Sequence, residues 1–228
     1  MIESLKRNVK RILKRRPNFG DLSDTRPLSR QFGFDRGTPI DRYYIDQFLS
    51  ENADAIHGRT LEIGDDEYTS RFGGDRTTQR DILHVHGGNP KATIVGDLTT
   101  PGLLPDAAFD CAVITQTLHL IYDMSEAVAN LHRAIKPGGT LLLTVPGITQ
   151  ISSDEWRHGW YWALTPASAQ RLVGDEFGAD RIAVHSWGNV FAAISFLSGV
   201  AVEEVPRAKL DVRDEAYPVT VAVRATRA

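Results

Sequence analysis

Short apolar runs alternate with longer segments of helical periodicity through most of the chain. Runs of about four to eight apolar or β-branched residues bounded by turn residues predict strands, and apolar residues at steps of three and four predict helices. The predicted strands are residues 60–63, 82–86, 92–95, 109–115, 141–145, 181–187 and 218–224. The predicted helices begin near residues 41, 123, 165 and 191. Strands that alternate with helices in this way predict an α/β fold with a parallel sheet.

The helix over residues 123–136 has the clearest boundary signals. Asp123 and Glu126 have the spacing of a capping box, and apolar residues repeat behind them at helical intervals. The Pro-Gly-Gly of residues 137–139 is expected to end the helix. By contrast, residues 71–80 contain two adjacent glycines and little apolar periodicity, so the helix after the first strand should be short or distorted.

The turn at the end of the first strand predicts a cofactor site. Ligands bind open parallel sheets beyond the carboxyl ends of the strands, and this strand ends at Gly64. A dinucleotide fingerprint would continue G-x-G-x-x-G, but Asp65, Asp66 and Glu67 follow instead. A carboxylate about 4 Å from a phosphate oxygen costs roughly 4 kcal/mol at an effective dielectric constant of about 20. The acidic turn therefore disfavours NAD and favours S-adenosylmethionine, which carries a sulfonium and an ammonium; the alternative is an ordinary acidic turn.

Two later strand ends supply further candidates for the cofactor. His86 lies roughly 20 residues after the glycine turn, where a residue that binds the ribose hydroxyls is expected. Asp97, after the third strand, is placed to accept a hydrogen bond from an adenine amino group. The structural alternatives are a histidine that only hydrogen-bonds the backbone and an aspartate that only caps a turn.

Composition indicates a globular chain. The 228 residues are 42% hydrophobic and 24% charged, with no apolar run long enough to cross a membrane and no signal-peptide pattern. A cytoplasmic protein is the expectation. Cys111 is the single cysteine, which excludes an internal disulfide, and its apolar neighbours indicate a buried strand residue.

The amino-terminal part differs from the rest in charge. Residues 1–16 contain seven Lys and Arg and one Glu, a net charge of +6. Because the whole chain has a net charge of −3, the remaining residues carry a net charge of −9. An apolar stripe makes this segment a predicted basic amphipathic helix that docks on its own domain or on a second copy in a homodimer, or that contacts an anionic membrane surface or a nucleic acid. Residues 18–39 are expected to form an arm or lid. The predicted division is 1–40 and 41–228.

Residues 41–228 resemble the class I S-adenosylmethionine-dependent methyltransferases. The resemblance rests on LEIGDD, the strand-end His86, GDL at Gly96, FDCAVITQTLHLIYD and LHRAIKPGGTLLLTVPG. It implies a Rossmann-like sheet of seven strands with an antiparallel last strand and helices on both faces. The cofactor residues that it implies are Glu62 and Gly64 at the methionine end, Asp66 and Tyr68 in an altered loop, Gln116 after the fourth strand, His86 at the ribose, where the family has an acid, and Asp97 at the adenine.

Three further segments narrow the resemblance. DRGTPIDRYYI, VPGITQIS and GNVFAAISFL are similar to segments of the small methyltransferases of polysaccharide and glycan biosynthesis, which include the mycobacterial methylmannose polysaccharide methyltransferases. This resemblance implies O-methylation of a sugar hydroxyl in a polysaccharide or oligosaccharide precursor, with a mannoside as one candidate acceptor.

The segment SSDEWRHGWYW, residues 152–162, is the predicted acceptor site. Aromatic faces beside polar groups suit a sugar, so Trp156, Trp160 and Tyr161 are predicted to bind it. Arg36 of the arm is expected to close over the ligand. The alternative is a lid whose rings pack inward.

The predicted base is His158, followed by Asp154 and then His119, because a sugar hydroxyl needs a proton acceptor within hydrogen-bond reach. A divalent metal is an option that no tight ligand spacing supports. Two alternatives to a sugar O-methyltransferase stay open: methylation of a small lipid or natural-product hydroxyl, and a non-catalytic module attached through the basic helix. DNA is disfavoured because residues 116–119 lack an Asn/Asp-Pro-Pro-aromatic motif and the main domain is acidic.

Overall fold

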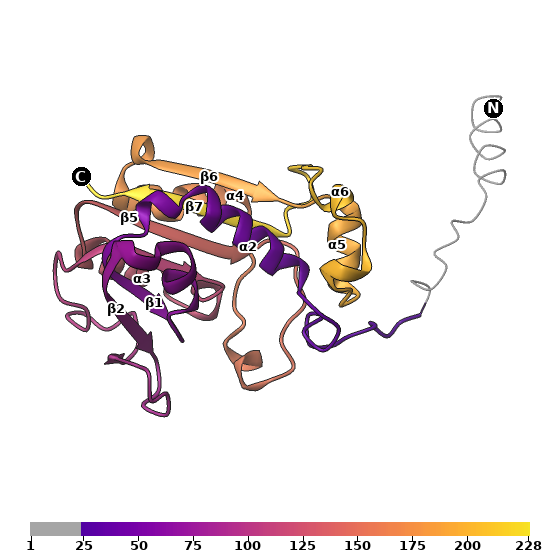
Figure 1. Ribbon diagram of the computed structural model, residues 1–228, viewed down its shortest axis with the longest axis horizontal. Coiled ribbons are helices and arrows are strands. Elements are labelled where there is room, and N and C mark those ends of the chain that lie inside the picture. Colours follow the sequence, from indigo (N-terminus) through magenta and orange to yellow (C-terminus); the bar gives the residue numbers. More distant parts are fainter. Residues whose placement is uncertain (1–23) are drawn as a thin grey trace, which may run out of the picture.

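The computed structural model describes residues 24–228, in which a seven-stranded sheet lies between helices (Figure 1). The helix predicted for residues 1–16, with its membrane, nucleic-acid and dimer contacts, lies outside these residues. In the described part, no helix combines the length and apolarity needed to span a membrane. The strands are β1 (Gly58–Ile63), β2 (Thr77–His84), β3 (Ile94–Val95), β4 (Phe109–Thr115), β5 (Ile135–Pro146), β6 (Ile182–Trp187) and β7 (Thr220–Thr226). The helices are α2 (Ile40–Glu51), α3 (Met124–Ala134), α4 (Pro166–Phe177), α5 (Val190–Leu197) and the short α6 (Arg207–Leu210).

The sheet has the order β3-β2-β1-β4-β5-β7-β6. Strands β1 to β5 pair in parallel, and β7 is antiparallel to both β5 and β6. The predicted seven strands and antiparallel last strand are confirmed. Because β7 lies between β5 and β6, the two edge strands of the sheet are β6 and β3. The strand order reverses between β1 and β4, where ligands bind in open α/β sheets.

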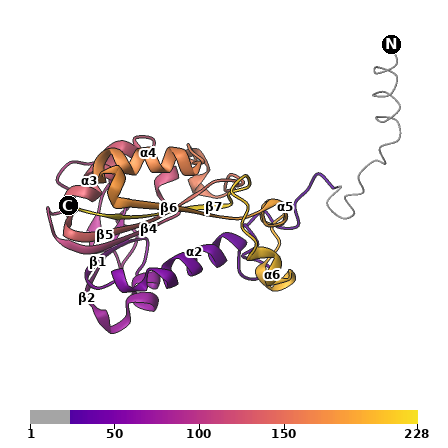
Figure 2. The same cartoon turned by 90° about the horizontal axis from the view of Figure 1, so that it is seen from above.

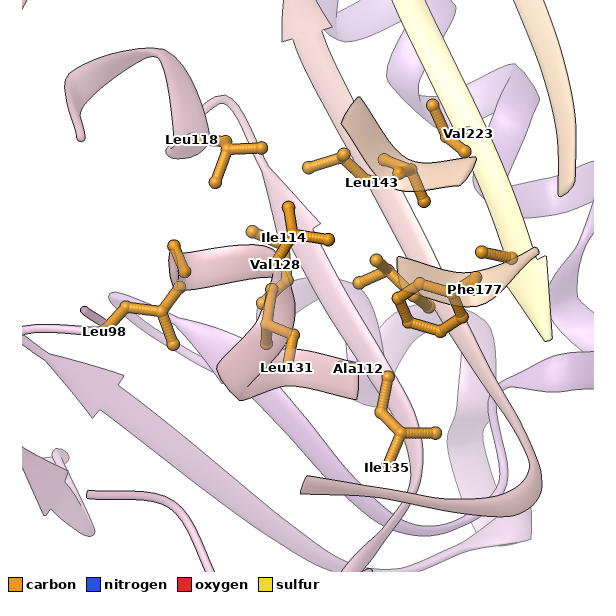
Figure 3. Packing of buried hydrophobic residues seen from close by; sticks show 14 of the residues in the cluster. Leu98, Ala112, Ile114, Leu118, Val128, Leu131, Ile135, Leu143, Phe177 and Val223 are labelled. Carbon is orange, nitrogen blue, oxygen red and sulfur yellow. The ribbon is translucent and has the colours of Figure 1, made fainter. Parts of the chain in front are cut away.

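Apolar side chains on both faces of the sheet form two cores. Helices α3 and α4 cover one face, and α2 and α5 cover the other (Figure 2). Successive β4 residues contribute to the two cores in turn. Ala112 and Ile114 pack toward α3 (Figure 3), whereas Cys111 and Val113 belong to the core on the side of α2 and α5. This alternation is the period of two of a strand buried on both faces. The prediction of a buried Cys111 is confirmed.

Several boundaries differ from the sequence prediction for identifiable reasons. Strand β2 begins at Thr77 because its first half pairs with β1, and it ends at His84 rather than at residue 86. Asp123 caps α3 by accepting from the Glu126 amide, at 3.2 Å. The helix ends at Ala134, and the Pro-Gly-Gly lies inside β5. A Cβ at Gly139 would approach the Asp110 carbonyl oxygen to 2.9 Å, so this irregular strand needs a glycine there.

The segment after β1 is short and distorted, as predicted. A π-helical turn, Thr69–Gly73, and a 3₁₀ turn, Gly74–Arg76, replace the usual helix. The chain enters β2 at Thr77, directly after the second turn. This leaves the carboxyl end of β1 covered by a loop, and the residues that fix the loop become important for the site.

Candidate functional site

A cavity of about 1060 Å³ lies beyond the carboxyl ends of β1, β2, β4 and β5. Residues 30–34 of the arm and residues from the 149–161 loop complete its walls. The predicted site residues that line it are Gly64, Asp97, Gln116, His119, Asp154, Trp156, Trp160 and Tyr161. The sheet thus brings together residues from four loops that are far apart in the sequence, at the edge where a cofactor is expected.

Gly64 ends β1 with a backbone that favours glycine. Its φ is +87°, and no atom lies within 4 Å of the position that a Cβ would occupy. The Gly64 amide donates to the Leu83 carbonyl at 3.0 Å, and the Gly64 carbonyl accepts from the Asn89 side-chain amide at 2.5 Å. The turn is therefore held from β2 and leaves open space where a ligand can approach the backbone.

Glu62 holds the loop and does not line the cavity. Its two carboxylate oxygens accept from the backbone amides of Tyr68, at 3.0 Å, and Thr69, at 2.8 Å. Burial raises the pKa of Glu62 to about 7, although both amides favour the ionised form. Asp66 and Tyr68 also lie outside the cavity lining, and the Tyr68 ring stacks on Phe72, with centroids 6.3 Å apart. In this structure the three residues shape the loop, and their contacts with the cofactor stay predictions.

The end of the cavity beside β2 and β3 contains Asp97 and His84. Asp97 Oδ1 accepts from the amide and the hydroxyl of Thr99, at 2.9 and 2.8 Å, so it caps a turn while it lines the cavity. His84 lines the cavity in place of His86, because β2 ends two residues earlier than predicted. His86 is exposed beyond it, with its ring stacked on Trp156, centroids 6.5 Å apart.

Three polar side chains at the end of β4 and in the 149–161 loop have unpartnered atoms. The Gln116 amide nitrogen, both His119 ring nitrogens and the Trp160 indole nitrogen are buried without a hydrogen-bond partner among the described residues. His119 is 1% exposed, and burial, together with the Arg42 charge, lowers its pKa to about 4. Its ring meets the Trp160 ring edge to face, with centroids 4.4 Å apart. Buried polar groups usually find partners, so these atoms are available to bind a ligand in the cavity.

The arm and the loop over residues 149–161 close the site through one aromatic contact. Phe32 stacks on Trp160, with ring centroids 5.8 Å apart, and also touches Phe196 of α5. Phe32 has a φ of +57°, an uncommon conformation for a bulky residue. The Gln150 side chain donates to the Arg30 carbonyl at 3.2 Å. Two lids therefore meet over His119.

Two further predicted residues are not brought to the cavity. His158 is exposed on the 3₁₀ turn Glu155–Gly159 and does not line the walls. Arg36 forms an ion pair with Glu204, at 2.5 Å, on the outside of the arm. Asp154 caps the turn by accepting from the Trp156 amide at 3.0 Å, and it remains at the cavity wall.

Asp41 and Arg42, at the start of α2, line the cavity although sequence reasoning did not select them. Asp41 is 9% exposed, and burial raises the pKa of its carboxyl group. The Arg42 guanidinium lies 5.7 Å from the centroid of the Phe34 ring. Two adjacent charges just before an apolar helical face were the available signal, since a charged pair is unusual in a position that packs against a sheet.

S-adenosylmethionine fits this donor set. Gly64 leaves space beside a backbone turn, unpartnered donors line the β4 end, and acidic residues line the walls without a phosphate-binding glycine loop. Within residues 24–228, no group of three or more His, Cys, Asp or Glu side chains is arranged to hold a metal ion.

Comparisons with known proteins agree with this geometry. Residues 76–143 match the methyltransferase domain family. The fold is similar to an S-adenosylmethionine-dependent methyltransferase from Mesorhizobium loti (TM-score 0.55, 16% identity, covering 82% of this chain and 100% of that one). It is also similar to a SAM-dependent methyltransferase from Archaeoglobus fulgidus (TM-score 0.54, 10% identity, covering 82% of this chain and 94% of that one). A third similar structure is the Haemonchus contortus phosphoethanolamine N-methyltransferase 2, in complex with S-adenosyl-L-methionine (TM-score 0.52, 14% identity, covering 80% of this chain and 52% of that one). No curated protein matches the chain.

The domain match confirms the predicted methyltransferase enzyme, and the sheet confirms the predicted class I methyltransferase fold. S-adenosylmethionine, the predicted cofactor, is bound by the Haemonchus contortus neighbour with this fold. At these low identities, the structural neighbours establish the fold alone. Neither comparison addresses the acceptor, and the roles of individual site residues stay predictions.

Proposed function

We propose that this class I methyltransferase methylates a hydroxyl group of a carbohydrate, and that a mannoside is the first acceptor to test. The observation that carries the proposal is the wall formed by Trp160, Tyr161 and His119. Ring faces beside unpartnered polar atoms suit a sugar, which offers apolar C–H faces and many hydroxyls.

His119 takes the role of the base in this proposal. S-adenosylmethionine, when bound, would supply an electrophilic methyl group on its sulfonium, whose S–CH3 bond breaks so that S-adenosylhomocysteine leaves. His119 is neutral at pH 7 and its nitrogens are free, so it accepts the hydrogen bond of the acceptor hydroxyl and takes the proton as the C–O bond forms. His158 is set aside because it is exposed outside the cavity.

The remaining groups position the acceptor and exclude water. Methyl transfer is an in-line displacement, so holding the oxygen in place provides most of the acceleration. Trp160 and Phe32 close over His119, and the Gln116 amide is available to bind an oxygen of either ligand. Asp154 contributes a carboxylate at the wall that can accept from a second sugar hydroxyl.

A second acceptor class is favoured by the rim of the cavity. Tyr122 packs on Tyr161 and Trp162, with ring centroids 5.3 and 5.6 Å apart, and all three rings are exposed. The Trp162 indole already donates to the Ile121 carbonyl at 3.1 Å, so its exposed face is apolar. Such a rim suits a lipid or natural-product hydroxyl. A non-catalytic module, the remaining alternative, does not account for the methyltransferase domain.

The test is methyl transfer from S-adenosylmethionine to a panel of acceptors at equal concentration. The panel contains methyl α-mannoside, short mannose oligosaccharides, a catechol and a long-chain alcohol. Selective O-methylation of the sugars supports the proposal, whereas transfer confined to the catechol or the alcohol supports the second class. Binding of S-adenosylhomocysteine is measured first by calorimetry, because an enzyme that does not bind it contradicts both proposals.

A further inference from the structure

The amino-acid end of the cofactor needs partners that the loop after β1 does not supply. This end carries a carboxylate and an ammonium, each of which needs an opposite charge or several hydrogen bonds when it is buried. Both oxygens of Glu62 are occupied by backbone amides, and Asp66 lies outside the cavity. The charges must therefore come from another part of the wall.

Cations are scarce on this wall. Among the described residues, the lysines and arginines that line the cavity are Arg30 and Arg42. Arg30 is exposed on the arm, whereas the Arg42 side chain is partly buried at the start of α2. Arg42 has no carboxylate partner within 4 Å in the described residues, unlike Arg36, Arg59 and Arg71. It is thus the partly buried arginine of this wall that forms no ion pair within 4 Å in residues 24–228; burial lowers its pKa, whereas the Asp41 charge and a hydrogen bond with the Tyr68 side chain raise it.

Asp41 is the matching anion. It also lines the cavity, it is 9% exposed, and one of its carboxylate oxygens accepts from the Arg42 amide at 2.9 Å. A carboxylate this deeply buried would ordinarily be expected to have a cationic partner. Because consecutive residues in the first turn of α2 reach the same cavity, they present one negative and one positive group side by side.

The position of the pair agrees with the orientation of the site. The Arg42 charge acts on the pKa values of both Tyr68, after β1, and His119, after β4, so the guanidinium lies near both loops. Strands β1 and β4 are neighbours in the sheet. Asp97, the predicted adenine residue, and His84, which lines the cavity in place of the predicted His86, lie at the β2 and β3 end instead. The pair is therefore on the side of Gly64 where the methionine end is expected.

We propose that Asp41 and Arg42 bind the amino-acid end of S-adenosylmethionine, with Arg42 on its carboxylate and Asp41 on its ammonium. This inference rests on the proposed methyltransferase function and assigns to α2 a contact that sequence reasoning gave to the glycine loop. A carboxylate on the acceptor is the other source of the same chemistry. The choice of cofactor analogue distinguishes the two.

The experiment compares two ligands by calorimetry. S-adenosylhomocysteine has the amino-acid end, and 5′-methylthioadenosine lacks it. Arg42→Gln and Arg42→Lys test the cation, Asp41→Asn tests the anion, and Arg71→Gln is the matched control, because Arg71 is engaged with Asp46 outside the cavity. Thermal unfolding of each variant checks that it is folded.

For wild type, we expect S-adenosylhomocysteine to bind more tightly than 5′-methylthioadenosine. Arg42→Gln should lower the affinity for S-adenosylhomocysteine by about 10- to 100-fold, which is the range of a charged hydrogen bond. Its affinity for 5′-methylthioadenosine should stay within about two-fold of that of wild type. Asp41→Asn should act in the same selective way, Arg42→Lys should recover part of the affinity, and Arg71→Gln should match wild type.

An equal loss of affinity of Arg42→Gln for both ligands would indicate that Arg42 has a structural role, and it would overturn the proposal. Unchanged affinity of Arg42→Gln for S-adenosylhomocysteine would also overturn it and would leave the acceptor as the source of any carboxylate. A wild-type protein that binds neither ligand would instead contradict the proposed function itself.

Discussion

The buried His119 predicts a pH-dependent stability that one substitution should remove. Its pKa is lowered from 6.5 to about 4, first by burial and then by the Arg42 charge. The unfolded chain therefore takes up a proton near pH 6.5, whereas the folded chain does so only near pH 4. This contribution to stability is fully present above pH 6.5 and is lost as the pH falls toward 4.

The magnitude follows from the shift. At 1.36 kcal/mol per pKa unit, the lowering of the His119 pKa from 6.5 to about 4 corresponds to about 3 kcal/mol of unfolding free energy. About 2 kcal/mol of this free energy is lost between pH 7 and pH 5. The side chain is buried, so solvent screening does not reduce this value greatly. Glu62 acts in the opposite direction: burial raises its pKa to about 7, so its contribution is present below pH 4.5 and is lost as the pH rises toward 7.

The assay is urea-induced unfolding of wild type, His119→Asn and His158→Asn near pH 7 and near pH 5. Comparing each variant with wild type at the same pH cancels the contribution of Glu62. The stability of His119→Asn relative to wild type should be about 2 kcal/mol more favourable at pH 5 than at pH 7. His158→Asn should follow wild type, because His158 is exposed. The same relative stability of His119→Asn at both pH values would refute the interpretation of a buried, neutral histidine.

Three further substitutions test the turn and the lid. Gly64→Val places a β-branched residue at a φ of +87° and fills the open space beside the turn, so calorimetry should show at least about 10-fold weaker binding of S-adenosylhomocysteine, and unchanged affinity would contradict the assigned site. Glu62→Ala leaves the Tyr68 and Thr69 amides without their partner, and urea unfolding should show a loss of about 2–4 kcal/mol; a loss below 1 kcal/mol would contradict this role. Trp160→Ala opens the cover over His119 and should raise the acceptor KM by about 10-fold while the affinity for S-adenosylhomocysteine stays within two-fold of wild type; equal effects on both ligands would place Trp160 at the cofactor.

The sheet could be predicted where local signals were strong. Strand β4 and helix α4 have the predicted boundaries because glycine, proline and capping residues stand next to clear periodicity. Strand β2 was predicted to begin too late, since its first residues are polar and become a strand only by pairing with β1. The position of β7 between β5 and β6 depends on tertiary pairing that periodicity does not encode.

The site could be predicted for residues at strand ends and less well for the rest. Gly64 and Gln116 directly follow strands, Asp97 and His119 follow within four residues of a strand end, and all of them line the cavity. The choice between His119 and His158 depends on burial, which neighbouring residues in the sequence do not determine. Asp41 reaches the site from a helix that precedes the first strand.

The most direct test of carbohydrate O-methylation by this protein is a methyl-transfer assay with mass spectrometry of the product. Wild type is incubated with S-adenosylmethionine and mannose oligosaccharides, and His119→Asn serves as the comparison. We expect a sugar that carries one additional O-methyl group, equimolar S-adenosylhomocysteine, and at least about 100-fold slower transfer by the variant. S-adenosylmethionine binding without methylation of any sugar, while another acceptor is methylated, would contradict the proposed carbohydrate acceptor.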